Sequence, residues 1–399
     1  MDVFFNKNHL NQDKLTYEYC HGAYLNYLKS GKLPFVISGW DVNNKIVTPV
    51  NILNSILTDI KINVNKYYLI EDDIGKSEIV QYLSKHSIHV KTTQVLVANS
   101  ATSLLCYAIF SVTSDKNGVL VLNPTYYSTN DSLLLMKRNF ISIGISLSKM
   151  SYDCNKIEHI LQSSSINTIV LTDPIFGSGI PISADNYNSI IYLANKYHCT
   201  LIVDLARYGL IWNEKKEPII GERLTYLKKA EKYVVIYSPC KKIFANGIKT
   251  GILISSENIA ETLAYYSDSV LGSVSAAQIE FLKILLSENS EHYIYNQMEN
   301  NVNQIKSQYE IIKSIILNSS LDILKPKMGH YALASFPLGG KTYQNVFDIL
   351  LNKAHAYTLP MELYGISDDT SYLFRINLLS ELDELVPVLW DILAILERS

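Results

Sequence analysis

The stretch YVVIYSPCKKIFANGIKTG, residues 233–251, decides the fold. Its first five residues, Tyr233–Tyr237, form the apolar, β-branched run that is typical of a buried strand. A lysine pair, Lys241 and Lys242, follows the end of this run. Lysine pairs lie more often on the solvent-exposed surface, but surface lysines rarely follow an apolar strand directly. Desolvation there lowers the pKa of a lysine and makes its amine a nucleophile for carbonyl groups.

Five more apolar runs lie along the chain, at Gln94–Ala98, Gly118–Leu122, Thr168–Thr172, Thr200–Val203 and Thr250–Ile254. Longer amphipathic stretches separate most of them, at Ala101–Val112, Asp131–Arg138, Ala184–Tyr197 and Leu224–Lys232. Strands and helices that alternate at this spacing predict βαβ units, and so an α/β fold with a mostly parallel sheet flanked by helices. Ligands of such sheets bind at the carboxyl ends of the strands, so the functional residues are expected there.

The last third of the chain has a different pattern, which predicts a smaller α+β domain. Two long helical patterns come first, at Ser275–Asn289 and His292–Asn318. Three short strand candidates follow, at Tyr331–Phe336, His355–Leu359 and Leu373–Leu378, and a final helix is expected at Leu382–Glu397. We therefore expect a large domain over residues 46–275 and a small domain over residues 276–399. Residues 1–45 are too few for a domain and are expected to pack on the small domain or at a subunit interface.

The composition excludes several classes of protein. The chain has 399 residues, 48% of them hydrophobic, which is enough for a large core. With 35 basic and 38 acidic residues the net charge is −3, so we expect no nucleic-acid partner. The apolar stretches are too short to span a membrane, and the N-terminus lacks a signal-peptide pattern. Five widely spaced cysteines without a Cys-x-x-Cys pair predict no disulfide framework and a cytoplasmic location.

Small or polar residues follow several of the predicted strands. Ala101 and Thr102 open a helix, where backbone N–H groups suit a phosphate, although an ordinary helix cap is the alternative. Tyr126 follows the next run and stacks on a flat cofactor or packs in the core. Asp204 ends an apolar run, where a carboxylate needs a cation such as a metal, an arginine or a protonated ring nitrogen. A helix cap or an ion pair with Arg207 is the simpler interpretation.

Taken together and in their order along the chain, these strand-end residues resemble the sites of the class I and II aminotransferases, which are pyridoxal 5′-phosphate (PLP) enzymes of fold type I. The most specific match is Ser-x-x-Lys, followed by a cation eight residues after the lysine and a glycine two residues further on. It consists of Ser238, Lys241, Lys249 and Gly251. This register implies that Lys241, not Lys242, forms the Schiff base with PLP. The match runs from about residue 99 to 251, and weaker matches extend it to Arg375.

The resemblance also implies a role for each matched residue. Asp204 pairs with the pyridinium nitrogen, so that the ring accepts electrons from the substrate. Tyr126 stacks on the ring, and Arg375 binds the substrate α-carboxylate, which fits a bidentate guanidinium. The phosphate is held by Ala101, Thr102, Ser238, Lys249 and, across the subunit boundary, Ser273. The family's assembly is a homodimer with active sites at the interface.

Two matches near the N-terminus are weaker. Trp40 lies where the family's N-terminal segment closes over the substrate, which implies a substrate contact. Tyr67 or Tyr68 lies near a cross-subunit tyrosine of the family. His330 is expected to be structural, and the alternative is that it approaches the active site from the small domain.

The sequence departs from the family at four cofactor contacts, two at the phenolic oxygen of PLP and two at its phosphate. Phe176 replaces the asparagine, and Arg207 the tyrosine, that bond the phenolic oxygen of PLP. Lys249 replaces an arginine at the phosphate, and Ser100 a glycine. The cation of Arg207 could pair with the phenolic oxygen, or reach into the pocket and bind a second acidic or carbonyl group of the substrate.

The predicted function is therefore PLP-dependent chemistry on an amino acid, most often transamination with a 2-oxo acid. The alternative is elimination, cyclisation or oxidation of an amino acid in specialised biosynthesis. A sensor or dead enzyme of the same fold is disfavoured because Lys241 and Asp204 are both present. A nucleotide-binding α/β enzyme would need a Gly-rich loop, and a hydrolase a Gly-x-Ser-x-Gly elbow, and neither motif is found. No metal site is predicted, since His86 and His89 have no third ligand nearby.

Overall fold

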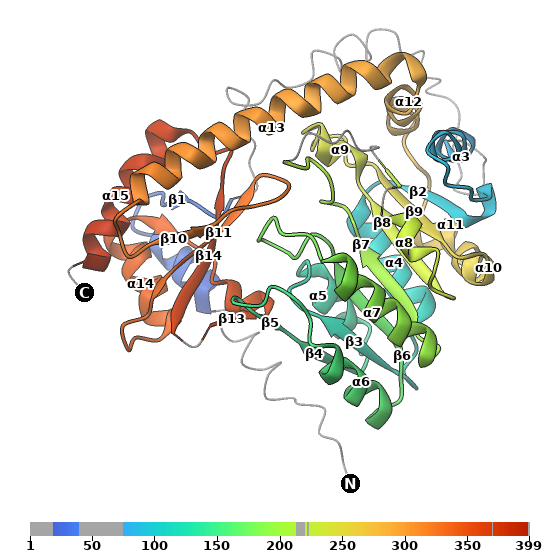
Figure 1. The fold of residues 1–399 in the computed structure, drawn as a ribbon, viewed down its shortest axis with the longest axis horizontal. Coiled ribbons are helices and arrows are strands. Elements are labelled where there is room, and N and C mark those ends of the chain that lie inside the picture. Colours follow the sequence, from blue (N-terminus) through green and yellow to red (C-terminus); the bar gives the residue numbers. More distant parts are fainter. Residues whose placement is uncertain (1–18, 40–74, 213–219, 222, 369, 398–399) are drawn as a thin grey trace.

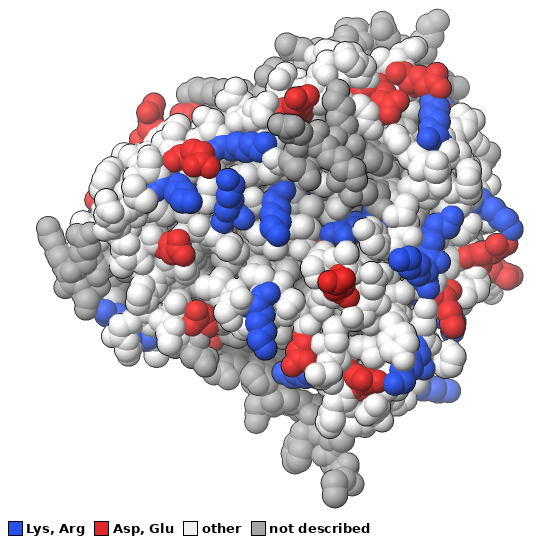
Figure 2. All heavy atoms as spheres, in the orientation of Figure 1, with Lys and Arg blue, Asp and Glu red and all other residues white. Residues whose placement is uncertain are grey.

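The computed structural model describes residues 19–39, 75–212, 220–221, 223–368 and 370–397. Figure 1 shows two lobes, one built on a large sheet and one on a small sheet, with the long helix α13 (Glu288–Ile316) running from one to the other. The predicted α/β class is confirmed. On the face shown in Figure 2, basic and acidic side chains are interspersed, as the small net charge would suggest.

Seven strands form the large sheet, in the order β2-β9-β8-β7-β6-β3-β4. They are β2 (Val95–Ala98), β9 (Gly251–Ser255), β8 (Tyr233–Tyr237), β7 (Thr200–Asp204), β6 (Ile166–Thr172), β3 (Gly118–Leu122) and β4 (Phe140–Ile143). All neighbours are parallel except β9, which runs antiparallel to β2 and β8. Every residue of β2, β3, β7, β8 and β9 is buried, because helices cover both faces of the sheet.

The helices of the large lobe are α3 (Lys76–Lys85), α4 (Ala101–Val112), α5 (Ser128–Leu135), α6 (Cys154–Ser163), α7 (Ala184–Lys196), α8 (Leu224–Leu227), α9 (Pro239–Lys242), α10 (Glu257–Tyr265) and α11 (Ser267–Leu271). Helix α4 packs against β2, β7, β8 and β9, so its first turn lies at the edge where these strands meet. Ser100 caps α4 by accepting a hydrogen bond from the Ser103 amide. None of the described helices is both long and apolar enough to cross a membrane.

The small lobe contains an antiparallel sheet of β10 (Asp322–Leu324), β11 (Tyr331–Pro337) and β14 (Ser371–Asn377). Its helices besides α13 are α14 (Tyr343–Lys353) and α15 (Leu382–Glu397). Helix α12 (Ala276–Leu285), which precedes α13, lies beside α3 of the large lobe (Figure 1). Two short parallel pairs join distant segments: β1 (Phe35–Val36) with β12 (Ala356–Tyr357), and β5 (Ile145–Ser146) with β13 (Ile366–Ser367). The start of the described chain and the large lobe are thus both hydrogen-bonded to the small lobe. The division of the chain at residues 45 and 275 stays a prediction.

All six predicted strand runs of the large sheet are confirmed, within two residues at each end. The predicted helix Leu224–Lys232 is wrong in length: α8 ends at Leu227. The reason is that the Lys232 carbonyl already accepts a hydrogen bond from Leu201 of β7, which requires an extended chain before β8. Helix α6 is not among the stretches named from the sequence, because it has few apolar residues and buries only Ile157 and Leu161.

Candidate active site

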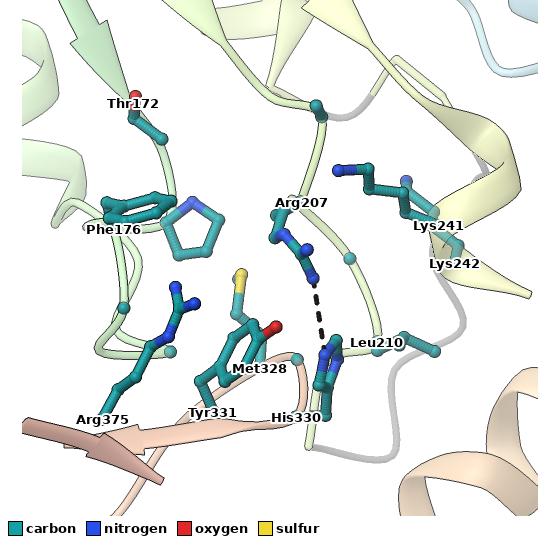
Figure 3. A pocket seen from close by; sticks show the side chains of 16 residues that line it. Thr172, Phe176, Arg207, Leu210, Lys241, Lys242, Met328, His330, Tyr331 and Arg375 are labelled. Carbon is teal, nitrogen blue, oxygen red and sulfur yellow. Dashed lines mark hydrogen bonds between the residues drawn. The ribbon is translucent and has the colours of Figure 1, made fainter. Parts of the chain in front are cut away.

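The carboxyl ends of β6, β7 and β8 meet at one edge of the large sheet, and two cavities adjoin there. The first, here called the sheet-edge cavity, is lined among others by Ala101, Thr102, Tyr126 and Asp204. The second, the interlobe cavity, lies between the large lobe and the small-lobe residues His330, Tyr331 and Arg375 (Figure 3). Both cavities are lined by Thr172, Phe176, Ala206, Arg207 and Lys241. Lys241 and Arg207 therefore face two compartments at once.

Asp204 is the last residue of β7 and is 7% exposed. One of its carboxylate oxygens, Oδ1, accepts a hydrogen bond from the Ala206 amide at 2.9 Å. Burial raises the pKa of this carboxyl, while the Ala206 amide and the positive charges of Lys241 and Arg207 oppose that shift. A cation placed in the sheet-edge cavity would stabilise the ionised carboxylate further.

Lys241 belongs to α9, the short helix that begins directly after Ser238 and β8. The pKa of its amine is lowered to about 8, chiefly by burial and then by the positive charge of Arg207, while the negative charge of Asp204 acts in the opposite direction. A lysine with such a pKa is partly neutral near physiological pH and so is available as a nucleophile or base. Its neighbour Lys242 is buried and lines only the interlobe cavity.

The first turn of α4 is pressed against the start of β9. A Cβ on Gly251 would lie 2.5 Å from the Ser100 carbonyl carbon and 2.6 Å from the Ala101 nitrogen, so only glycine permits this approach. Ser238 is buried, and its hydroxyl donates a hydrogen bond to the Thr250 carbonyl at 3.3 Å, next to Gly251. The motif residues thus surround the N-terminus of α4, the kind of helix end that binds anions.

Two residues that sequence reasoning missed hold this region together. The Gln278 side chain, in the first turn of α12, donates hydrogen bonds to the carbonyls of Asn99 at 3.2 Å and Ile248 at 2.9 Å. The Asn99 side chain donates to the Ser273 carbonyl at 3.1 Å. The loop before α4, the Ile248–Lys249 turn and Ser273 are therefore linked, although Lys249 itself is exposed. A capping box between Ser275 and Gln278 was the only sequence signal for this arrangement.

Arg375 is almost fully buried in β14, with 2% exposure. Its Nε and Nη2 atoms donate hydrogen bonds to the Ser38 carbonyl at 3.0 and 2.8 Å. The guanidinium lies 4.6 Å from the centre of the Tyr331 ring and 5.5 Å from that of Phe176. Figure 3 shows it directed into the interlobe cavity. Arg375 is therefore a buried residue of this cavity and not a surface one.

The aromatic residues line the boundary between the two cavities. Tyr126 is half-buried, and its ring centre lies 6.0 Å from that of Phe176. Phe176 is 4% exposed and also packs on Tyr364, with 5.1 Å between the ring centres. Phe176, which departs from the family pattern, thus forms an apolar wall that touches the guanidinium of Arg375. Trp40, Tyr67 and Tyr68 lie outside the described residues.

Arg207 and His330 meet across the two lobes. Arg207 Nη1 lies 3.4 Å from His330 Nε2, and its guanidinium lies 5.1 Å from the centre of the Tyr331 ring (Figure 3). Burial lowers the pKa of His330 well below its ordinary value, and the positive charges of Arg207, Arg375 and Lys241 add to this effect. His330 was expected to be structural, yet it lines the interlobe cavity as a neutral imidazole. Within the described residues, no group of three His, Cys, Asp or Glu side chains is placed to hold a metal ion.

Solved aminotransferases share this fold. An aspartate aminotransferase from Rhizobium meliloti aligns over 95% of each chain with a TM-score of 0.79 and 16% identity. An alanine aminotransferase from Pyrococcus furiosus aligns over 94% of this chain and 95% of its own, with a TM-score of 0.77 and 15% identity. YbdL from Escherichia coli, which has a methionine aminotransferase function, aligns over 94% and 95%, with a TM-score of 0.76 and 13% identity. The fold and site together define the class as aminotransferase-like.

The chain belongs to the aminotransferase class I and II family, whose model matches residues 60–389. No curated protein matches the chain in sequence. Enzymes of this family depend on PLP and act on amino acids and 2-oxo acids, so this protein is a PLP-dependent, aminotransferase-like transferase.

Proposed function

We propose that this protein is an aminotransferase that moves an amino group from an amino acid to a 2-oxo acid. One observation carries the proposal: Lys241 lines both the cavity that contains Asp204 and the cavity that contains Arg375. A lysine in that position can hold a cofactor on one side and reach a substrate on the other. The family and fold agree with this reaction, and neither supports the lyase or oxidase alternative.

The residues of the sheet-edge cavity fit PLP. The first turn of α4 forms the cradle, and the backbone of Gly251 packs against it so closely that any Cβ would clash with Ser100 and Ala101. We propose that the phosphate binds there, to Ala101, Thr102, Ser238, Lys249 and, from a neighbouring subunit, Ser273. Buried Asp204 would pair with the pyridinium nitrogen and Tyr126 would stack on the ring. When bound, PLP supplies an electron sink for the bonds at the substrate Cα.

The other steps belong to residues of this chain. Arg375 binds the substrate α-carboxylate, and Phe176 and Tyr331 keep its guanidinium in place and exclude water from it. Lys241 acts first as a base, which takes the proton from the substrate Cα, and then as an acid, which gives a proton back. An amine with a pKa of about 8 suits both roles. We further propose that Trp40 contacts the substrate and that Arg207 contacts the cofactor or the substrate side chain.

The test is covalent labelling together with product analysis. Borohydride should fix PLP to Lys241, as located by peptide mass mapping. A Lys241→Ala variant should not be labelled. Its kcat should fall about a hundredfold to ten-thousandfold, the usual contribution of acid–base catalysis. Lys242→Met is the matched control, because it keeps the buried stem and removes the neighbouring amine, and it should still be labelled at Lys241.

Product analysis separates the possible reactions. With a panel of amino acids, amino-group transfer should require an added 2-oxo acid and should release no ammonia. Release of ammonia or uptake of oxygen without an acceptor would contradict transamination and favour the elimination, cyclisation or oxidase alternative. Absence of any borohydride label at Lys241 would remove the assignment of the cofactor lysine.

We also propose a cytoplasmic homodimer with active sites at the interface. Sedimentation of the purified protein should give twice the chain mass. A monomer that retains full activity would contradict the proposal, because Ser273 is assigned to the phosphate of the neighbouring subunit.

A further inference from the structure

We propose that Arg207 and His330 form a second anion subsite beside Arg375, and that the substrate is an amino acid with an acidic side chain. The inference rests on the proposed function, since it names the substrate class of the same site. It uses a residue, Arg207, that stands where the family pattern has an uncharged tyrosine.

The two guanidiniums are close enough to bind one small molecule. The Cζ atoms of Arg207 and Arg375 lie 5.1 and 4.6 Å from the centre of the same ring, that of Tyr331. Their separation therefore cannot exceed the sum of these distances. In Figure 3 they lie on either side of Tyr331, and both line the interlobe cavity. A short dicarboxylate extends far enough to place one carboxylate at each guanidinium, and guanidiniums bind carboxylates through paired hydrogen bonds.

His330 holds Arg207 in this position. A guanidinium can only donate hydrogen bonds, so His330 Nε2 accepts from Arg207 Nη1 and the imidazole proton lies on Nδ1. The imidazole itself is held by Phe244, edge-on with 5.5 Å between ring centres, and by Tyr331 at 4.2 Å. Because burial keeps the imidazole neutral, His330 orients Arg207 without repelling it. His330 is therefore a positioning residue in our proposal.

The surroundings of the subsite suit an acidic side chain. The described residues that line the interlobe cavity include Arg207, Lys241 and Arg375 but no aspartate or glutamate. An anionic group of the substrate thus meets no like charge among these residues. Arg207 also lines the sheet-edge cavity, so this residue adjoins both the proposed cofactor site and the proposed substrate site.

Dissociation constants of two unreactive analogues test the proposal on the PLP-loaded enzyme. Succinate carries two carboxylates and butyrate only one, on carbon chains of the same length. Calorimetric titration should show succinate binding about tenfold to hundredfold more tightly, the range expected for hydrogen bonds to a charged group. Arg207→Gln should abolish this preference and leave butyrate binding within about twofold. Arg207→Lys, which keeps the charge and loses the paired geometry, should retain part of it.

Further variants separate positioning from general charge. His330→Phe keeps an aromatic ring and removes the acceptor, so it should weaken succinate binding several-fold and leave butyrate binding unchanged. Arg138→Gln removes one positive charge outside both cavities and should leave the preference intact. Equal affinity of the unaltered enzyme for succinate and butyrate would overturn the proposal.

The competing role of Arg207 gives a different result. If Arg207 pairs with the phenolic oxygen of PLP, Arg207→Gln will shift the pH titration of the cofactor absorbance and preserve the preference for succinate. That outcome would also overturn the proposal. A failure of the proposed function is read separately, from the absence of a borohydride label at Lys241 or of amino-group transfer.

Discussion

Lys241 illustrates how a side chain acquires its chemistry from its neighbours. Its amine is mostly buried, with the positive Arg207 and the negative Asp204 as its main charged neighbours. Burial and Arg207 favour the neutral amine, and Asp204 favours the charged one, so the balance places the pKa at about 8. An exposed lysine remains protonated over this range, with a pKa of about 10.4.

The pH dependence of Lys241 labelling follows from this balance. In the cofactor-free protein an amine-directed reagent should label Lys241 with a half-maximal rate near pH 8, because the amine is protonated below its pKa and neutral above it. Arg207→Gln should raise the midpoint by removing a positive neighbour. Asp204→Asn should lower it by removing a negative one. Mass spectrometry of the labelled peptide measures the midpoint, and one that moves in neither variant would refute the electrostatic account.

At the scale of elements, the site depends on how β9 and α4 meet. The antiparallel strand β9 pairs Gly251 with Ala98 at the end of β2, only three residues before α4 begins. The backbone of Gly251 therefore contacts the cap of α4, and Gln278 of α12 links the two neighbouring loops. Three elements thus determine the shape of the proposed phosphate cradle.

Gly251→Ala should disturb this junction. The added Cβ would clash with Ser100 and Ala101, so we expect a loss of about 1–3 kcal/mol in the free energy of unfolding, the usual cost of overpacking. PLP affinity should fall as well. Gly247→Ala is the matched control, since no atom lies within 4 Å of its Cβ, and it should stay within about 0.5 kcal/mol. Urea unfolding and PLP titration measure both effects, and equal behaviour of the two variants would contradict the cradle.

At the scale of the whole molecule, Ser38 connects segments that are far apart in sequence. Its carbonyl accepts two hydrogen bonds from Arg375. Its hydroxyl donates to the Arg375 carbonyl at 2.9 Å and accepts from the Leu359 amide at 3.2 Å. The Tyr331 hydroxyl donates to the next carbonyl, that of Gly39. The segment before residue 40 is therefore part of the support of the substrate arginine.

Ser38→Ala should reveal this support. Loss of two buried hydrogen bonds should cost about 1–3 kcal/mol of unfolding free energy and leave the Leu359 amide without its acceptor. With the backbone of Arg375 less restrained, KM should rise more than kcat falls. Ser163→Ala makes the same chemical change at an exposed position of α6. It should change neither the unfolding free energy nor KM measurably. A normal KM for Ser38→Ala would show that Arg375 is held without the hydroxyl.

Local patterns predicted the large lobe well. Six of the seven strands of the large sheet, and helices α4, α5 and α7, follow from apolar periodicity, because the sheet is buried on both faces and its strands are nearly all apolar. Short helices such as α8 and weakly apolar ones such as α6 were mispredicted or missed, since hydrogen bonds to distant strands and tertiary packing determine them. Candidates at strand ends, including Lys241 and Asp204, could be found from sequence because parallel strands bring their carboxyl ends to one edge.

The sequence by itself determined the α/β class, the positions along the chain of six strands of the large sheet and the residues that follow them. Only the tertiary structure decided which of these residues meet: Arg207 with His330, Arg375 with Ser38, and Gln278 with the loop before α4. These contacts join residues more than a hundred positions apart, or different lobes, and no periodic pattern records them. Their geometry depends on how the two lobes pack, which is a property of the folded chain and not of any one segment.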